Sequence, residues 1–223
     1  MARFSRLRAR RPEGGHTLIE LLVAMSLLSL VTASAFGAVI VMQNQAVATT
    51  SRFTAEGEGQ TIADRITKDL RTAVAPNTTT AAFASAAAND VVFYASLSDL
   101  STAGAGPVRL HAYTSLVPST SVYVFHEDAT KPDNGGSAGS YTYSGSPVNR
   151  LDGQYIDTSQ PIFSYYTAAD PVHPIAFPIS TTAGLRSIDA VGVTLRIRVK
   201  PRAPVVVIQT RIHVRNVDYN PNN

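Results

Sequence analysis

The sequence predicts an α+β fold, in which a long N-terminal helix packs on an antiparallel β-sheet head. Three observations predict it: an uncharged apolar run, an amphipathic continuation of that run with helical period, and a later series of β-branched and aromatic runs separated by turn residues. With 223 residues, 44% of them apolar, the chain can form one membrane helix and one globular head. We therefore expect a basic leader (1–15), a membrane-spanning helical half (16–43), a soluble amphipathic half (44–76) and a β-rich head (77–223).

The leader carries most of the chain's basic character. Its arginines are Arg3, Arg6, Arg8, Arg10 and Arg11, and its one acid is Glu13. Removing residues 1–15 would change the formal net charge from +3 to −1, so the composition argues against a strongly basic nucleic-acid-binding protein. Cysteine is absent, which excludes disulfides, thiolate metal sites and a cysteine nucleophile.

The apolar run from Leu21 to Met42 is long enough to cross a membrane. As a helix these uncharged residues would span about 33 Å, against a hydrocarbon core of about 30 Å. A buried core helix is the alternative, but such a helix usually shows a wider polar stripe than the few serines and threonines found here. The arginines before the run place the N-terminus in the cytoplasm and the head outside it.

The small residues that could mark a cleavage site come before the apolar run. An ordinary secretory signal is cut after its apolar region, whereas a cut beside Gly14 and Gly15 would leave the helix on the mature protein. Spacing alone leaves open a later cut near Ala33, Ala35 or Ala38.

The residues from Gly14 to Met25, GGHTLIELLVAM, closely resemble the prepilin motif of type IV pilins and type II secretion pseudopilins. The resemblance implies cleavage after Gly15 by a prepilin peptidase on the cytoplasmic side, followed by N-methylation of His16. The family usually has phenylalanine where this chain has His16. This departure bears on methylation more than on cleavage, because the glycine before the cut is retained.

Glu20 is a candidate assembly residue. A charge inside a bilayer costs about 3 kcal/mol on insertion scales, so an acid near the membrane end of an apolar helix needs a cationic partner. After cleavage, the α-amino group of His16 would lie one helical turn away and would be equally available to a neighbouring chain. In the family resembled, the corresponding glutamate is thought to meet the N-terminal amine of an adjacent subunit. The alternative is an interfacial acid that faces water and lipid headgroups.

The helical pattern resumes beyond the membrane run. Ile62, Ile66 and Leu70 recur at helical spacing. The charged residues between them, Asp69 included, are expected on the other face of the helix. Because Pro76 cannot continue a helix, the predicted element runs from about Thr17 to Ala75. Its glycines Gly37, Gly57 and Gly59 are candidate bend points, and close helix packing is the alternative for the first of them.

Six strands are predicted after a surface loop or weak helical turn that extends from Pro76 to Asn89. They are Val91–Ala95, Val108–Thr114, Ser121–His126, Pro161–Thr167, Val191–Val199 and Val205–Val214. The last two alternate apolar and polar residues, which indicates an antiparallel sheet with one face in water and the other covering the Ile62, Ile66, Leu70 stripe. The order of residues, with Phe163–Tyr166 before a final strand pair, also resembles larger minor pilins and the J-type minor pseudopilin.

Catalytic and metal-binding chemistry is not expected from the sequence. Gly135–Gly139 fits the G-x-S-x-G pattern, but it sits in a Gly/Ser-rich loop and lacks the strand–turn–helix context of a nucleophile elbow. A calcium-binding loop around Asp128, Asp133 and Asn134 is less favoured than a solvated turn, because the EF-hand spacing is absent. The histidines also lack metal-site spacing and are expected to be strand or loop residues: His111, His126, His173 and His213.

One basic face is expected on the last two strands. Its members are Arg196, Arg198, Lys200, Arg211 and Arg215. Like charges opposite each other in a sheet are unfavourable, so acids of a neighbouring subunit, DNA phosphates or lipid headgroups could offset them. The alternative is a solvated face partly balanced by nearby aspartates.

These observations lead to one main functional hypothesis and three rivals. The chain is expected to be a structural subunit, without enzymatic activity or cofactor, of a type IV pilus or type II secretion pseudopilus. A large, loop-rich head favours a minor subunit near the tip. Its partners would be other pilin or pseudopilin subunits, a prepilin peptidase and methyltransferase, the inner-membrane assembly platform and membrane lipid.

The expected location is the bacterial cytoplasmic membrane, crossed once with the head outside the cytoplasm, and then a filament at the cell envelope or surface. The rivals are a major filament subunit, a DNA-binding uptake pilin, and a membrane-tethered enzyme or receptor that shares only the leader. A clustered acid/base site in the folded head would favour the last of these, and the sequence shows none.

Overall fold

A computed structural model describes residues 17–97, 106–133, 141–177, 179–200 and 203–214. The chain forms two compact units, residues 1–47 and residues 48–223, and each is described by itself below. The elements in chain order are α1 (Leu18–Arg71), β1 (Phe83–Ala86), β2 (Asp90–Ala95), β3 (Val108–Val117), β4 (Val122–Thr130), β5 (Val148–Ile156), β6 (Phe163–Thr167), α2 (Thr182–Arg186), β7 (Ile188–Ile197) and β8 (Val206–His213). A long N-terminal helix followed by an antiparallel sheet confirms the predicted α+β class.

Helix α1 ends at Arg71, a few residues before the predicted boundary. The chain leaves the helix there because its backbone begins to pair with β2. The amide of Val74 donates to the carbonyl of Tyr94, and the amide of Ser96 donates to the carbonyl of Thr72, both at 2.9 Å. These bonds satisfy backbone groups that would otherwise be orphaned at the helix end. α1 is helical through Gly37, Gly57 and Gly59.

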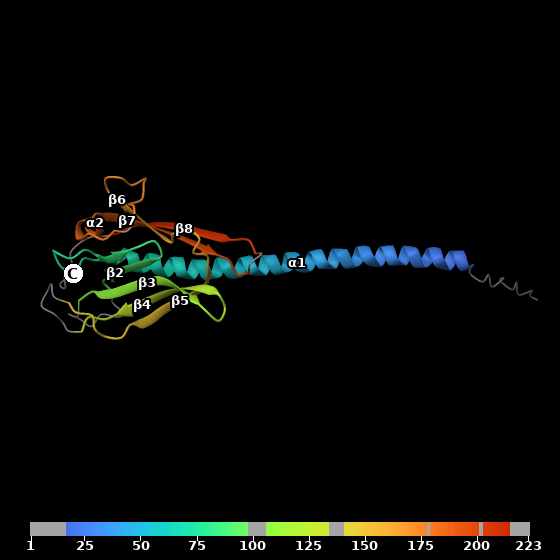
Figure 1. Cartoon of the computed structure of the whole chain (residues 1–223), viewed down its shortest axis with the longest axis horizontal. Helices are drawn as coiled ribbons and strands as arrows, with labels where there is room; N and C mark the ends of the chain where they lie inside the picture. The colour runs from blue at the N-terminus through green and yellow to red at the C-terminus, as the bar shows by residue number, and fades with distance from the viewer. Residues whose placement is uncertain (1–16, 98–105, 134–140, 178, 201–202, 215–223) are drawn as a thin grey trace, which may run out of the picture. The chain divides into compact units, whose positions relative to one another are not determined.

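All the strands belong to one antiparallel sheet with the order β1-β2-β3-β4-β5-β7-β6, and β8 pairs with β7. Within the second unit, β3, β4 and β5 lie on one side of the last part of α1, and β7 and β8 lie on the other (Figure 1). Among the described residues, the strand pairing that joins these two groups is that of Ile156 of β5 with Ile197 of β7. The sheet therefore curls around the helix.

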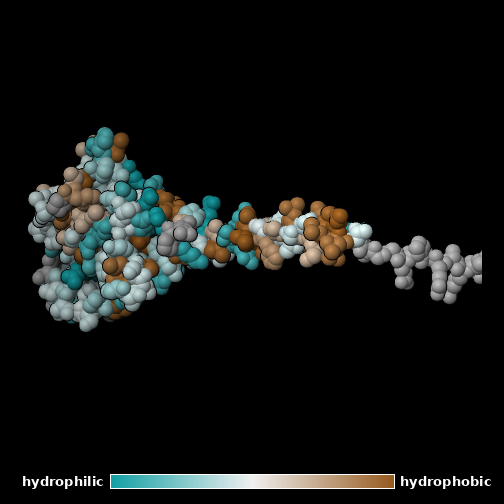
Figure 2. Space-filling view, turned by 45° about the vertical axis from the view of Figure 1, so that its right-hand side comes forward, coloured by the Kyte–Doolittle hydropathy of each residue, from teal (hydrophilic) through white to brown (hydrophobic). Residues whose placement is uncertain are grey.

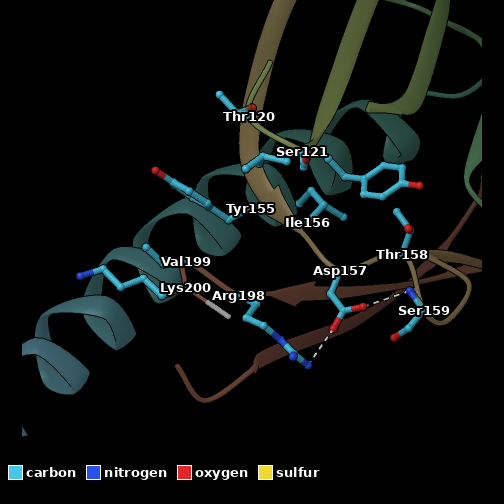
Figure 3. A pocket seen from close by; sticks show the side chains of 12 residues that line it. Thr120, Ser121, Tyr155, Ile156, Asp157, Thr158, Ser159, Arg198, Val199 and Lys200 are labelled. Carbon is cyan, nitrogen blue, oxygen red and sulfur yellow. Dashed lines mark hydrogen bonds and ion pairs between the residues drawn. The ribbon is translucent and has the colours of Figure 1, made fainter. Parts of the chain in front are cut away.

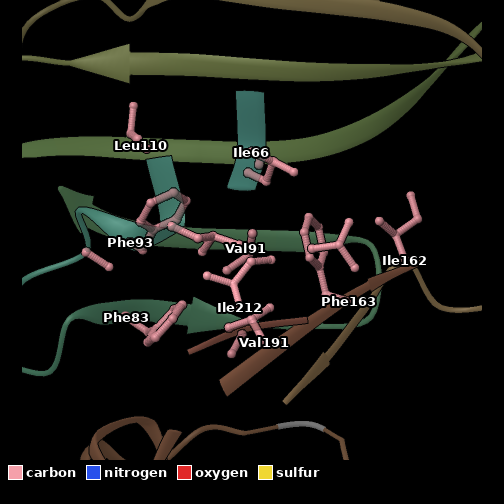
Figure 4. Close-up of a cluster of buried hydrophobic side chains, with 14 of the residues drawn as sticks. Ile66, Phe83, Val91, Phe93, Leu110, Ile162, Phe163, Val191 and Ile212 are labelled. Carbon is pink, nitrogen blue, oxygen red and sulfur yellow. The ribbon is translucent and has the colours of Figure 1, made fainter. Parts of the chain in front are cut away.

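The core lies between the sheet and the C-terminal part of α1. Ile62, Ile66 and Leu70 are fully buried, as the sequence pattern predicted. Aromatic side chains from several strands surround them, including Phe93 and Phe163, and Figure 4 shows this cluster. Fully burying a side chain of this size contributes about 1.5–3 kcal/mol, so the core is the main source of the head's stability.

Two glycines allow the helix and the sheet to approach closely. A Cβ at Gly59 of α1 would collide with the side chains of Ile208 and Ile197, and a Cβ at Gly153 of β5 would collide with Ile62. Gly59 is therefore a packing residue within a continuous helix. Gly57 has open space around it, so no contact requires a glycine there.

A buried ionic cluster also joins the helix to the sheet. It contains Arg65 and Asp69 of α1, Glu127 of β4 and Arg150 of β5. Oδ2 of Asp69 lies 3.2 Å from Nε of Arg65 and 3.1 Å from Nη1 of Arg150, and both acids are fully buried. The prediction that Asp69 lies on the polar face of the helix is wrong, because ion pairs with Arg65 and Arg150 hold its carboxylate inside the head.

Two strands were not predicted. β1 lies in the segment expected to be a loop or a helical turn. Its alanine-rich sequence has little strand character of its own, and its pairing with β2 stabilises it as a strand. β5 mixes charged and polar residues because Arg150 points into the ionic cluster while Asp152 faces solvent, so it lacks a regular alternation.

Candidate functional site

The N-terminal part of α1 exposes apolar side chains around its whole surface. Large apolar residues from Leu18 to Val47 are about half to four-fifths exposed in the first unit. Apolar residues dominate the face of this segment that Figure 2 shows. Within the described residues, α1 is long and apolar enough to cross a membrane, as judged by length and composition. A bare apolar helix of this kind requires a bilayer or other helices to cover it.

The hydroxyl groups in this segment are satisfied inside the helix. Ser26 donates to the carbonyl of Val23 at 2.8 Å, and Thr32 donates to that of Leu28 at 2.7 Å. Ser29 and Ser34 bond back in the same way. Because these groups need no water, they do not oppose insertion into an apolar environment.

Glu20 lies in the first turn of α1, which Thr17 caps. The amide of Glu20 donates to Oγ1 of Thr17 at 3.3 Å, and the amide of Leu21 donates to the carbonyl of Thr17 at 3.1 Å. A threonine followed three residues later by a glutamate is the pattern of a capping box. The carboxylate therefore sits near the positive end of the helix dipole, where the expected partner amine would also lie. Gly15 and His16 lie outside the described residues.

Strand register separates the predicted basic residues. Arg211 of β8 lies opposite Gly192 of β7, whereas Arg196 of β7 lies opposite Val207. The four-residue offset along β7 corresponds to roughly 13 Å. Arg211 places its guanidinium 3.7 Å from the centre of the Tyr166 ring, a cation–π contact. The structure therefore does not bring Arg211 together with Arg196, and Arg215 lies outside the described residues.

Arg198 and Lys200 line an open cavity of about 620 Å³ at the junction of β4, β5 and β7 (Figure 3). Nη2 of Arg198 lies 3.2 Å from Oδ2 of Asp157. Hydrogen bonds from Ser159 and the positive charges of Arg198 and Arg196 lower the pKa of Asp157. Arg198 is thus balanced by an acid of its own head, which reduces the net charge that this surface offers to phosphates.

Backbone strain is concentrated in the same cavity. Ser121 and Tyr155 have φ values of 53° and 66°, and both line the cavity. A positive φ is uncommon for a residue other than glycine and is an outlier for one as bulky as tyrosine. The sheet also contributes its single β5–β7 pair here, through Ile156. These features mark the place where the chain bends from one part of the sheet to the other.

The histidines lie on strands or in loops, as predicted: His111 on β3, His126 on β4, His213 on β8 and His173 between β6 and α2. Among the described residues, no group of three or more histidine, cysteine or acidic side chains could hold a metal ion. Asp128 instead accepts a hydrogen bond from the Tyr113 hydroxyl at 3.1 Å, and Asp133 accepts from the amides of Ser144 and Gly145. The Gly135–Gly139 pattern and Asn134 lie outside the described residues.

The segment that leads into the bare apolar helix matches a family model. The chain carries a prokaryotic N-terminal methylation motif. The match covers residues 10–36, and the motif is typical of type IV pilins and pseudopilins. No curated protein and no solved structure matches the chain.

The methylation motif, together with the apolar helix that begins within it, supports a pilin- or pseudopilin-like role with anchoring in a membrane. The motif's family is structural. The motif also suggests assembly with other pilin subunits and processing by a prepilin peptidase. The match ends in the apolar half of α1 and does not extend to the β-rich head.

Proposed function

We propose that the chain is a structural subunit of a type IV pilus or type II secretion pseudopilus, assembled through the apolar half of α1. The observation that carries this proposal is a bare apolar helix that begins within the methylation motif and continues beyond it. In the membrane, lipid covers this helix. In a filament, the same surface is covered by the corresponding helices of neighbouring subunits, which requires no partner of different chemistry.

The leader is removed after Gly15, and the new α-amino group of His16 is methylated. The head lies outside the cytoplasm, because the leader arginines are retained on the inner side. The size of the head favours a minor subunit near the tip over a repeated shaft subunit. Its work is assembly, which requires no active site.

Glu20 pairs with the amine of His16 on a neighbouring subunit and thereby sets axial register. The position of Glu20 in the first helical turn supports this role, because the amine lies at the same end of the helix. The attraction acts in a poorly screened setting, where two opposite charges interact strongly. Thr17 caps the start of the helix by accepting a hydrogen bond from the amide of Glu20.

The experiment is substitution of Glu20 by glutamine, followed by measurement of the protein in sheared filaments and in membranes. Glu20→Gln keeps the side chain's size and removes its charge. We expect normal insertion and leader cleavage but at least a tenfold loss of incorporation. The matched control is Glu56→Gln, which removes an acid further along α1 that pairs with Arg52 at 2.8 Å. Wild-type incorporation of the Glu20→Gln protein would show that Glu20 is only an interfacial acid.

A further inference from the structure

Ser115, His126 and Asp152 form a hydrogen-bonded chain on the solvent-facing side of the sheet. Oγ of Ser115 lies 2.8 Å from Nε2 of His126, and Nδ1 of His126 lies 2.6 Å from Oδ1 of Asp152. The three residues come from β3, β4 and β5. His126 pairs directly with Asp152 and with Tyr113 on its two sides, and Ser115 is the next outward-facing residue of β3. Strand register alone brings these distant residues together.

The hydrogen bonds indicate which atoms of Ser115, His126 and Asp152 carry protons. Nδ2 of Asn149 also donates to Oδ1 of Asp152 at 2.7 Å. The bonds from Asn149 and His126 lower the pKa of Asp152, so its carboxylate is ionised and can only accept. Nδ1 of His126 must therefore carry a proton. In the neutral imidazole, Nε2 is then unprotonated and accepts the hydrogen bond of the Ser115 hydroxyl.

Aromatic stacking fixes the orientation of the imidazole. The Tyr113 ring stacks on His126 with 5.0 Å between centroids and 27° between planes, and the His111 ring stacks on Tyr113 at 4.3 Å. Oδ2 of Asp90 lies 2.8 Å from Nε2 of His111 and steadies that end of the row. The His126 side chain is 20% exposed, so it is held in the row and still open to a small molecule.

We propose that Ser115 is an activated nucleophile that accepts acyl groups from small activated esters. His126 is its general base, and Asp152 is a positioning residue that holds His126 in the required tautomer. This arrangement of nucleophile, base and orienting group is the one that activates serine in hydrolytic enzymes of unrelated folds. The inference goes beyond assembly and does not depend on it.

The reaction conserves atoms and electrons without a co-reactant. Oγ of Ser115 forms a bond to the ester carbonyl carbon as Nε2 of His126 takes the hydroxyl proton. The carbon–oxygen bond to the leaving alcohol then breaks, and the alcohol departs with the proton from His126. Water can remove the acyl group from Ser115 by the same route. General-base catalysis contributes about 10²- to 10⁴-fold, so Ser115 should react faster than an ordinary serine by that factor.

The test is acetylation of the purified full-length chain, in detergent, by p-nitrophenyl acetate. The measurements are the release of p-nitrophenolate and peptide mapping of acetylated serines. We expect acetylation of Ser115 at least about 100-fold faster than that of other serines, and a fall to their rate in the isosteric variant Asp152→Asn and in His126→Gln. Ser187→Ala is the matched control. The Ser187 hydroxyl donates to the carbonyl of Gly184 and has no histidine partner among the described contacts, so this variant should react like wild type.

Thermal unfolding of each variant separates a catalytic role from a structural one. A purely structural hydrogen-bond chain would change the unfolding temperature of Asp152→Asn and leave the acetylation rate of Ser115 as it was. That result, or a folded wild-type chain that shows neither acetyl groups on Ser115 nor any release of p-nitrophenolate that depends on His126, would overturn the proposal. Loss of acetylation in a variant that unfolds at the wild-type temperature would support it.

Discussion

Nη1 of Arg150 lies 3.1 Å from Oδ2 of Asp69, and this contact joins strand β5 to helix α1 inside the head. Only 6% of the Arg150 side chain is exposed, and that of Asp69 is not exposed at all. Arg150 also lies 3.5 Å from Oε1 of Glu127 on β4. One cation therefore holds together three elements that are far apart in the sequence.

Removing this cation should destabilise the head strongly. Arg150→Met keeps much of the side chain's volume but leaves two buried acids with only Arg65 to balance them, and breaking a buried ion pair costs about 3–5 kcal/mol. We expect a loss of this size in the free energy of unfolding from urea titration. Lys131→Met, at an exposed position after β4, is the matched control and should change stability by less than about 0.5 kcal/mol. Equal stability of the two variants would mean that the contact contributes nothing.

The stability of the head should fall as pH rises. Burial, together with the nearby charge of Asp69, raises the pKa of Glu127 from 4.5 to about 8. Between these values the unfolded chain loses the proton while the folded chain keeps it, so folding becomes less favourable as pH increases. This contribution of Glu127 to stability is present in full below pH 4.5 and is lost as the pH rises through about 8.

Glu127→Gln should remove this part of the pH dependence. Glutamine resembles the protonated acid, so the variant should match wild type near pH 5 and exceed it in stability at pH 8.5. Urea midpoints at several pH values measure the difference, and Glu56→Gln on the surface of α1 serves as the control. A variant with the same slope of stability against pH as the wild-type head would contradict the assignment of the slope to Glu127.

Two neighbouring glycines of α1 should respond in opposite directions to alanine. Gly57→Ala enters open space and should stabilise the helix by about 1 kcal/mol. Gly59→Ala must push aside the ends of Ile197 and Ile208, and overpacking of this kind costs about 1–3 kcal/mol. Urea unfolding of the two variants measures the contrast directly. Stabilisation of both would show that the helix can move away from the sheet without loss.

Leader removal should depend on Gly15. Intact mass of the mature protein should show loss of residues 1–15 and an N-terminus at His16, one methyl group heavier. Gly15→Leu should block the cut, because a larger side chain does not fit a peptidase pocket shaped for glycine. Gly14→Leu is a comparison at the adjacent position. A mature protein that begins near Ala33 to Val39 and lacks the apolar helix would contradict the pilin reading.

The sequence predicted the parts of the fold that depend on local pattern. The stripe of Ile62, Ile66 and Leu70 and the alternation in β7 and β8 follow from helical and strand periods, and both are found. β5 was not predicted because its inward-facing residue Arg150 is charged and therefore breaks the apolar alternation. The buried partners of Arg150 come from α1 and β4, which a local pattern cannot reveal. Asp69 was misplaced for the same reason.

The site residues divide in the same way. The prepilin-like motif is local in sequence and could be recognised from it. The chain of Ser115, His126 and Asp152 is not local, because its spacing in sequence reflects hairpin lengths and has no fixed signature. Pairing the predicted strands that contain His111 and His126 as a hairpin could have placed part of this group together from the sequence. The register of β4 with β5, which brings in Asp152, required the structure.

Among the described strands, β5 and β7 share one registered pair, Ile156 with Ile197, so the backbone ladder of the sheet is thinnest at this junction. The two parts of the sheet stay joined elsewhere, because the amides of Ile162 and Phe163 donate to the carbonyl of Ala88 and both parts share one core. The head should therefore open locally at the β5–β7 junction before it unfolds as a whole. Amide hydrogen exchange should show weaker protection for Asp157 and Arg198, whose amides bond across the junction, than for amides in the middle of the β7–β8 ladder.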